Sequence, residues 1–127
     1  MKLLLDTHAL IWWAAASRKL ARSVRERIDD PANEVLISSA AIWELEIKAQ
    51  TGKLLAPDDA ADMIAEWGFV ALEISPEHAR LAAHLPEHHR DPFDRMLVAQ
   101  TYLEDAVLVT ADRTLGRYGV ATLRADG

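Results

Sequence analysis

Short, uninterrupted apolar runs, separated by segments with helical periodicity, constrain the fold of this chain most strongly. The runs occupy residues 3–5, 35–37, 69–72 and 106–110, and residues 120–123 form a candidate edge strand. Strands without polar alternation are typical of parallel sheets that helices cover on both faces. Strands that alternate with helices, joined by right-handed crossovers, predict an α/β fold with a central, mainly parallel sheet of four to five strands.

The helices are predicted from apolar spacing, capping residues and breakers. Ser75 and Pro76 match an N-cap followed by a first helical residue, and Asp91 with Pro92 repeats that pattern. Ser38 or Ser39 can cap the third helix, and Pro57 with Asp58 opens the fourth. The expected helices span residues 9–16, 18–29, 40–50, 57–67, 76–85 and 92–104, with a short helical turn at 113–117.

Bulk properties limit the classes of protein to consider. A chain of 127 residues, 50% hydrophobic, is expected to form a single domain over residues 1–127. The absence of cysteine excludes disulfides, zinc–thiolate sites and a thiol nucleophile. No apolar stretch approaches the length of a membrane span, so the cytoplasm is the expected location. The net charge of −6 argues against nucleic-acid binding through overall positive charge, although a local basic patch is compatible with it.

Four carboxylates lie where strands end or helices begin. Asp6 follows the first apolar run and Asp112 follows the fourth, while Glu44 and Asp94 lie on predicted helices. In parallel sheets, ligands bind at the carboxyl edge of the strands, where loops and helix starts meet. Carboxylates gathered there repel one another, and a shared cation would remove that repulsion. The four acids therefore form a candidate metal site.

Each acid also has an ordinary explanation. Asp94 suits the first turn of a helix that Asp91 caps, and Glu44 can pair with Lys48 four residues on. Asp6 and Asp112 can each cap the segment that follows them. The helical row through Glu44 is largely apolar, which makes an unpaired carboxylate costly there. The joint placement of the acids favours a metal, whereas no single acid requires one.

An all-oxygen set of ligands selects a hard cation, Mg²⁺ or Mn²⁺. Such an ion lowers the pKa of bound water and neutralises charge that develops on a phosphodiester, so hydrolysis would need no protein nucleophile. Thr7, Thr110, Ser38 and Ser39 can orient ligands or simply cap helices.

The remaining polar and aromatic residues give weaker signals. The histidines form no zinc pattern, and the run His88-His89-Arg90 is interpreted as a surface loop. The tryptophans are expected to pack in the core or at an interface. Adjacent residues of a helix point in different directions, so Trp12 and Trp13 cannot both enter one core, and one of them is a candidate to face a partner subunit. The candidate phosphate-binding bases are Arg18, Arg22, Arg25, Lys48 and Arg95, although for each one taken alone a solvated helix face is the favoured interpretation.

Four ordered segments carry a resemblance to a known family. They read LLLDTHALIWW, SSAAIWELEIKAQTGKL, HRDPFDRMLVAQ and LVTADRTLGRYGV, and together they extend over essentially the whole chain. The chain resembles PIN-domain ribonucleases, particularly VapC-type toxins of bacterial type II toxin–antitoxin systems. The resemblance implies a three-layer α/β/α fold, metal-dependent endonucleolytic cleavage of RNA, a homodimer and an inhibitory cognate antitoxin.

The family's acidic positions fall on Asp6, Glu44, Asp94 and Asp112, and the resemblance favours Asp94 over Asp91. Our hypothesis is that Asp6 and Asp94 bind the ion directly, while Glu44 and Asp112 hold water or a second ion. Glu44 is the candidate to orient or deprotonate the attacking water. The alternatives are a catalytically silent PIN-like protein-binding module and a phospho-acceptor receiver domain. The chain lacks two features expected of a receiver domain: an acid directly after residues 35–37 and a lysine near the end of a later strand.

Overall fold

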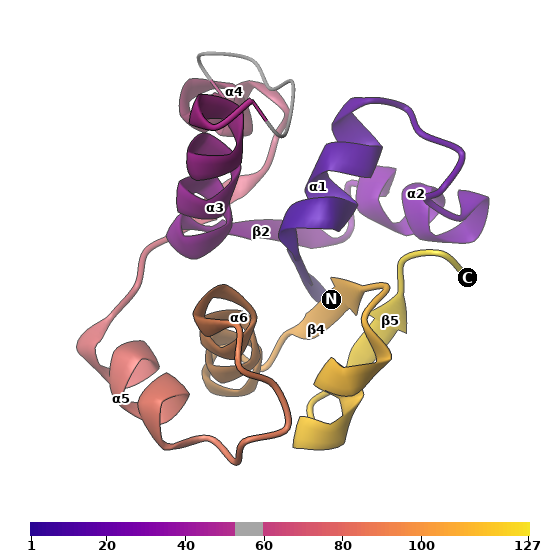
Figure 1. Ribbon diagram of the computed structural model, residues 1–127. Helices are drawn as coiled ribbons and strands as arrows, with labels where there is room; N and C mark the ends of the chain where they lie inside the picture. Colours follow the sequence, from indigo (N-terminus) through magenta and orange to yellow (C-terminus); the bar gives the residue numbers. More distant parts are fainter. Residues whose placement is uncertain (53–59) are drawn as a thin grey trace.

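The structure is a computed structural model that describes residues 1–52 and 60–127, in which strands and helices alternate (Figure 1). The predicted start of the fourth helix, at Pro57 and Asp58, lies outside the described residues. The strands are β1 (Lys2–Leu5), β2 (Glu34–Ser38), β3 (Val70–Leu72), β4 (Val107–Thr110) and β5 (Thr122–Arg124). The helices are α1 (Thr7–Ala14), α2 (Arg22–Asp29), α3 (Ser39–Gln50), α4 (Ala60–Glu66), α5 (Pro76–His84) and α6 (Pro92–Leu103), with a 3₁₀ helix, η1 (Arg113–Tyr118).

The five strands form one sheet in the order β3-β2-β1-β4-β5. All four strand pairings are parallel, with Leu4 opposite Leu36 on one side and Leu108 on the other. The predicted parallel α/β sheet is therefore confirmed.

Successive residues of the central strands point to opposite faces of the sheet, and both faces are buried. Leu3 and Leu5 pack into a core shared with α1, α2, α3 and α4, whereas Leu4 packs into a second core with Leu97 of α6 and Leu115 of η1. Figure 1 shows the corresponding layers, with α1 to α4 on one side of the sheet and α5 and α6 on the other. Burial on both faces explains why these strands are apolar at every position.

Several predicted boundaries differ from the structure, among them the first helix, which spans Thr7–Ala14 rather than residues 9–16. The second helix begins at Arg22 rather than at Arg18, because Ala21 has an extended backbone and donates its N–H to the carbonyl of Ala125 at 2.8 Å. The last strand is Thr122–Arg124 rather than residues 120–123. At the start of α2 and in β5, hydrogen bonds to another segment of the chain decide the boundary, and the local sequence pattern does not predict it. Among the described residues, no helix is long and apolar enough to cross a membrane.

The chain direction across the sheet changes between β1 and β4. From β1 the chain proceeds outward through β2 to β3, and it then returns to β4 on the other side of β1. The backbone N–H of Asp6 donates to the carbonyl of Val109 at 3.1 Å, so the ends of these two strands stay together. Such a switch point leaves a crevice at the carboxyl edge, where ligands of open α/β sheets bind.

Candidate active site

Asp6 lies at the switch point as the N-cap of α1. Its carboxylate accepts the Ala9 N–H at 2.8 Å, and the residue is only 6% exposed. Burial raises the pKa of Asp6, although hydrogen bonds from Thr110 and Ala9 oppose the rise. The predicted capping role is confirmed, but the carboxylate is also held in a buried position beside other acids, which a cap alone does not require.

Glu44 is a buried residue of α3, and two groups hold its carboxylate. Oε1 accepts the Thr7 hydroxyl at 2.6 Å, and Oε2 lies 3.0 Å from Lys48 Nζ. The predicted ion pair is present, but it is not the exposed pair of an ordinary surface helix, since Glu44 is only 9% exposed. These contacts fix the Glu44 carboxylate toward α1.

Asp94 lies in the first turn of α6, which Asp91 caps by accepting the Phe93 and Asp94 N–H groups at 2.8 and 3.4 Å. The pKa of Asp94 is raised to about 7, mainly by burial and further by the negative charges of Asp91, Asp6 and Glu44. The structure thus brings three of the predicted acids close enough for their charges to interact. A bound cation would relieve this unfavourable charge.

Asp112 is the N-cap of η1 and accepts the Thr114 N–H at 2.9 Å. Burial alone would raise the pKa of Asp112, but hydrogen bonds from Thr114 and His89 outweigh it and the pKa is lowered. The Thr110 hydroxyl accepts the Asp112 N–H at 3.0 Å and also bonds to the Asp6 carboxylate. Thr110 therefore joins the two acids that follow β1 and β4.

His89 is the site residue that sequence reasoning missed. Its Nε2 lies 3.0 Å from Asp112 Oδ2 and 3.5 Å from Asp94 Oδ2, and the side chain is 22% exposed. In the described part of the chain, one group of possible metal ligands has all its ligand atoms within 4.8 Å of one another: His89, Asp94 and Asp112. Asp6 and Glu44 are outside that group and act on Asp94 through charge. The interpretation of residues 88–90 as a plain surface loop is wrong for His89, and only its place just before the acidic helix start hinted at this.

Two of the five bases proposed to bind phosphate have structural roles instead. Arg25 donates to the carbonyls of Trp12 and Trp13 at 3.3 Å, and Arg95 donates to the carbonyls of Ala82 and Leu85 at 3.0 and 2.9 Å. Lys48 pairs with Glu44. Arg18 and Arg22 are exposed, and Arg22 pairs with Glu26 at 3.4 Å.

A pocket of about 500 Å³ lies beside the acids, between α1 and α3. Its lining includes His8, Trp12, Lys19 and Lys48. Lys48 also contacts Glu44, so the pocket adjoins the acidic site directly. A basic and aromatic surface is therefore available next to the acids in a chain of negative net charge.

The tryptophans divide between packing and exposed positions. Trp13 packs against Trp67 and Phe69 with ring centroids 5.5 and 4.7 Å away, as predicted for core packing. Trp43 of α3 packs edge-on against Phe93 but is 61% exposed.

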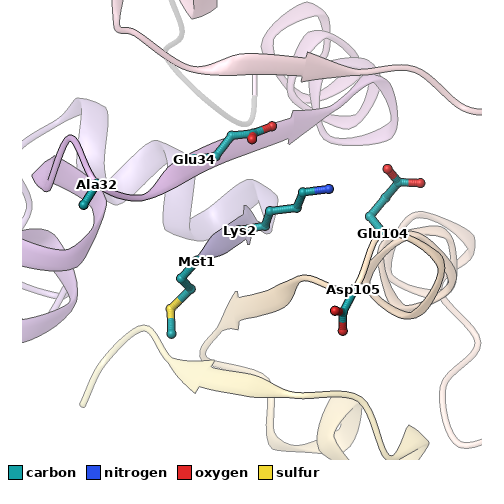
Figure 2. A pocket seen from close by; sticks show the side chains of 6 residues that line it. All are labelled: Met1, Lys2, Ala32, Glu34, Glu104 and Asp105. Carbon is teal, nitrogen blue, oxygen red and sulfur yellow. The ribbon is translucent and has the colours of Figure 1, made fainter.

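A second group of acids lies at the opposite edge of the sheet. Figure 2 shows Lys2 and Glu34 at the amino ends of β1 and β2, near Glu104 and Asp105 at the end of α6. Because these residues lie at the amino ends of the strands, they are separate from the crevice at the carboxyl edge. They provide matched positions for control substitutions.

Comparison with known proteins gives consistent matches along the chain. The family model described as PIN domain matches residues 3–121. Ribonuclease VapC22 of Mycobacterium tuberculosis is 29% identical over 119 residues, which cover 88% of each chain. The DNA-bound VapBC structure from Salmonella typhimurium aligns with a TM-score of 0.71 at 21% identity, over 97% of both chains. A toxin–antitoxin complex from Klebsiella pneumoniae aligns with a TM-score of 0.69 at 20% identity, again over 97% of both chains.

Proposed function

The chain belongs to the PIN-domain family, and we propose that it is a divalent-metal-dependent endoribonuclease that hydrolyses RNA phosphodiester bonds. The observation that supports the proposal is that Asp6 and Glu44 lie close enough to Asp94 to help raise its pKa to about 7, while Asp112 lies beside Asp94 on the same crevice. A ribonuclease among the relatives supports RNA as the substrate.

The donor set fits a hard cation such as Mg²⁺ or Mn²⁺. The four predicted ligands are carboxylates, and they are partly withdrawn from water, so a cation would replace unfavourable repulsion by attraction. In the proposed arrangement, Asp6 and Asp94 bind the ion directly, and Glu44 and Asp112 hold water or a second ion. When bound, the ion supplies Lewis acidity toward water and the phosphate and neutralises charge that builds in the transition state.

Glu44 is the proposed group that orients or deprotonates the attacking water. Thr7 occupies Oε1 and Lys48 occupies Oε2, so the carboxylate has one defined orientation. Each carboxylate oxygen has two lone-pair sites, which leaves Glu44 able to accept a further hydrogen bond from water. Preorganised positions of this kind lower the barrier because less reorientation is needed during the reaction.

The pocket between α1 and α3 is the proposed place for RNA next to the scissile phosphate. Lys19 and His8 can approach phosphate oxygens, and Trp12 offers an aromatic surface to a base. This local surface resolves the difficulty that a net charge of −6 poses for RNA binding.

The proposal extends to the biological setting. The VapBC and toxin–antitoxin relatives support the role of the toxin in a bacterial type II toxin–antitoxin pair, acting in the cytoplasm, with an inhibitory antitoxin as partner. We also propose a homodimer. The exposed Trp43 on α3 is an apolar side chain that a protein partner would cover.

The test is cleavage of structured and unstructured RNAs by purified wild-type, Asp94→Asn and Glu34→Gln protein. With Mg²⁺ or Mn²⁺, wild type and Glu34→Gln should cleave equally, and Asp94→Asn should be slower by about 100-fold or more. Chelator should abolish cleavage by all three. Equal cleavage by Asp94→Asn and wild type would contradict the proposed site, and cleavage that persists in chelator would contradict the proposed metal dependence.

A further inference from the structure

Both ring nitrogens of His89 make defined contacts. Nδ1 lies 3.0 Å from the backbone nitrogen of Asp91, whose N–H donates to it. Nε2 faces the site, 3.0 Å from Asp112 Oδ2 and 3.5 Å from Asp94 Oδ2. The ring thus bridges the cap of α6 and the acids.

These contacts determine which nitrogen carries the proton. The Asp91 N–H can only donate, so Nδ1 must be the unprotonated acceptor, and a neutral imidazole then carries its proton on Nε2. The neighbours of Nε2 are carboxylate oxygens, which accept. The hydrogen bonds at the two nitrogens therefore agree on one tautomer.

The same tautomer is unsuited to metal binding, although the distances to Asp94 and Asp112 would allow it. A histidine that binds a metal through one nitrogen almost always donates the other ring N–H to a carboxylate, carbonyl or water. At His89 the other nitrogen meets a donor instead. Ligation through Nε2 would require a proton on Nδ1, directly against the Asp91 N–H.

We propose that His89 is a positioning residue of the candidate nuclease site, which uses its Nε2–H to hold the Asp112 carboxylate beside Asp94 and does not bind the metal. The proposal deepens the proposed function and rests on it for the meaning of the site. It assigns His89 a place beside Asp94 and Asp112, as the hydrogen-bond donor to the Asp112 carboxylate.

The backbone around His89 is anchored in a way that suits this role. Its N–H donates to the Tyr118 hydroxyl at 2.9 Å, and its carbonyl accepts from Arg95 at 3.3 Å. Tyr118 is the last residue of η1, the helix that Asp112 caps. The donor and its acceptor are thus fixed to the same small unit of structure, so the Nε2–H is aimed before any ligand arrives.

Two substitutions of His89 test the acceptor role of Nδ1 and the donor role of Nε2 separately. His89→Asn keeps an acceptor at the same bond distance from Cβ as Nδ1 and removes the donor that reaches Asp112. His89→Gln places an amide N–H as far from Cβ, in bonds, as Nε2. The control is His88→Asn, because His88 is the exposed neighbour whose ring packs against Tyr118.

The direct test is the tautomer of His89 in the purified protein, read from the ring ¹⁵N shifts by NMR at neutral pH and assigned from the signals that vanish in His89→Gln. We expect a neutral ring protonated on Nε2, both in chelator and with saturating Mg²⁺. A ring protonated on Nδ1, a charged ring, or loss of the Nε2 proton when Mg²⁺ is added would each overturn the proposal. This readout does not depend on cleavage.

Metal binding and kinetics provide the second test. His89→Asn should weaken Mn²⁺ binding and lower kcat for RNA by about 10-fold or more with little change in KM, and His89→Gln should recover most of both. Thermal melting checks that each variant is folded. Equal losses in Asn and Gln variants, or none in either, would contradict a donor role. If Asp94→Asn still cleaved RNA, the proposed function would fail while the NMR result would still decide the state of His89.

Discussion

The Thr7 hydroxyl donates a 2.6 Å hydrogen bond to Glu44 Oε1, and this bond joins the first turn of α1 to the middle of α3. Both residues are buried, and Thr7 directly follows Asp6. The contact therefore fixes the distance between two acids that arrive on different elements. It also satisfies a carboxylate that would otherwise be costly to bury.

Thr7→Val should uncouple these two acids while keeping the shape of the side chain. We expect a loss of about 1–2 kcal/mol in the free energy of unfolding, because Glu44 loses one of its two partners. RNA cleavage should fall by about 3–10-fold through kcat, in line with loss of a hydrogen bond of this strength. Thr51→Val is the control, since the Thr51 hydroxyl donates to the Lys48 carbonyl at the exposed end of the same helix. Identical effects of the two substitutions would show that Thr7 has no special link to the site.

The raised pKa of Asp94 predicts how the metal-free protein responds to pH. In the folded chain Asp94 titrates at about 7, against 3.8 as its ordinary value. Between these values the folded state retains a proton that the unfolded state has released, so stability falls as pH rises through this window. Asp94→Asn removes the effect.

In chelator at pH 8, Asp94→Asn should therefore be more stable than wild type by about 1–2 kcal/mol, which is roughly 3–8 °C in Tm, and near pH 4 the gain should vanish. Calorimetry across this pH range measures it. A gain that is largest at acid pH, or absent throughout, would mean that the Asp94 carboxylate is not destabilised by its surroundings.

Lys19 should contribute to RNA binding through the pocket between α1 and α3. In an Asp94→Asn background, Lys19→Ala should weaken binding of single-stranded RNA and reduce the dependence of log affinity on log salt by about 0.7. Lys2→Ala is the control, because Lys2 lies at the opposite edge of the sheet (Figure 2). If both variants changed the slope equally, the RNA would not be held in this pocket.

Arg95 should matter for stability rather than for phosphate binding. Its guanidinium donates to the carbonyls of Ala82, Leu85 and Pro86 and so ties the end of α5 to α6. Arg95→Met should lower the free energy of unfolding by about 2–3 kcal/mol, whereas the exposed Arg90→Met should leave it within about 0.5 kcal/mol. Denaturant titration of both variants measures the difference. A stable Arg95→Met protein with weakened RNA binding would restore Arg95 as a phosphate contact.

The sheet could be predicted from sequence because its strands are buried on both faces. The runs at residues 3–5 and 106–110 have no polar alternation, which leaves a covered parallel sheet as the natural solution. The start of α2 could not be predicted in the same way. The hydrogen bond from the Ala21 N–H to the Ala125 carbonyl delays the start of the helix to Arg22, and no local pattern indicates a partner more than a hundred residues away.

The acids of the candidate site follow from similar reasoning, since the ends of β1 and β4 must meet at one edge of the sheet. The residues that contact these acids could not be predicted in this way. His89 has an ordinary loop sequence around it, and its role depends on the direction of its ring relative to Asp91 and Asp112. Arg25 and Arg95 were predicted as surface bases because nothing in the sequence indicates the carbonyl groups that accept from them. Spacing predicts which elements meet, whereas side-chain partners depend on the packed structure.

In the proposed site, Asp6, Glu44, Asp94 and Asp112 together hold divalent cations at the carboxyl edge of the sheet. Titration of Mn²⁺, followed by electron paramagnetic resonance of the free ion, tests it most directly in wild type, Asp6→Asn, Asp94→Asn and Glu34→Gln. We expect the same Mn²⁺ affinity for wild type and Glu34→Gln, and a loss of about 10-fold or more in Asp6→Asn and in Asp94→Asn. Equal Mn²⁺ affinity in all four proteins would contradict the proposed site.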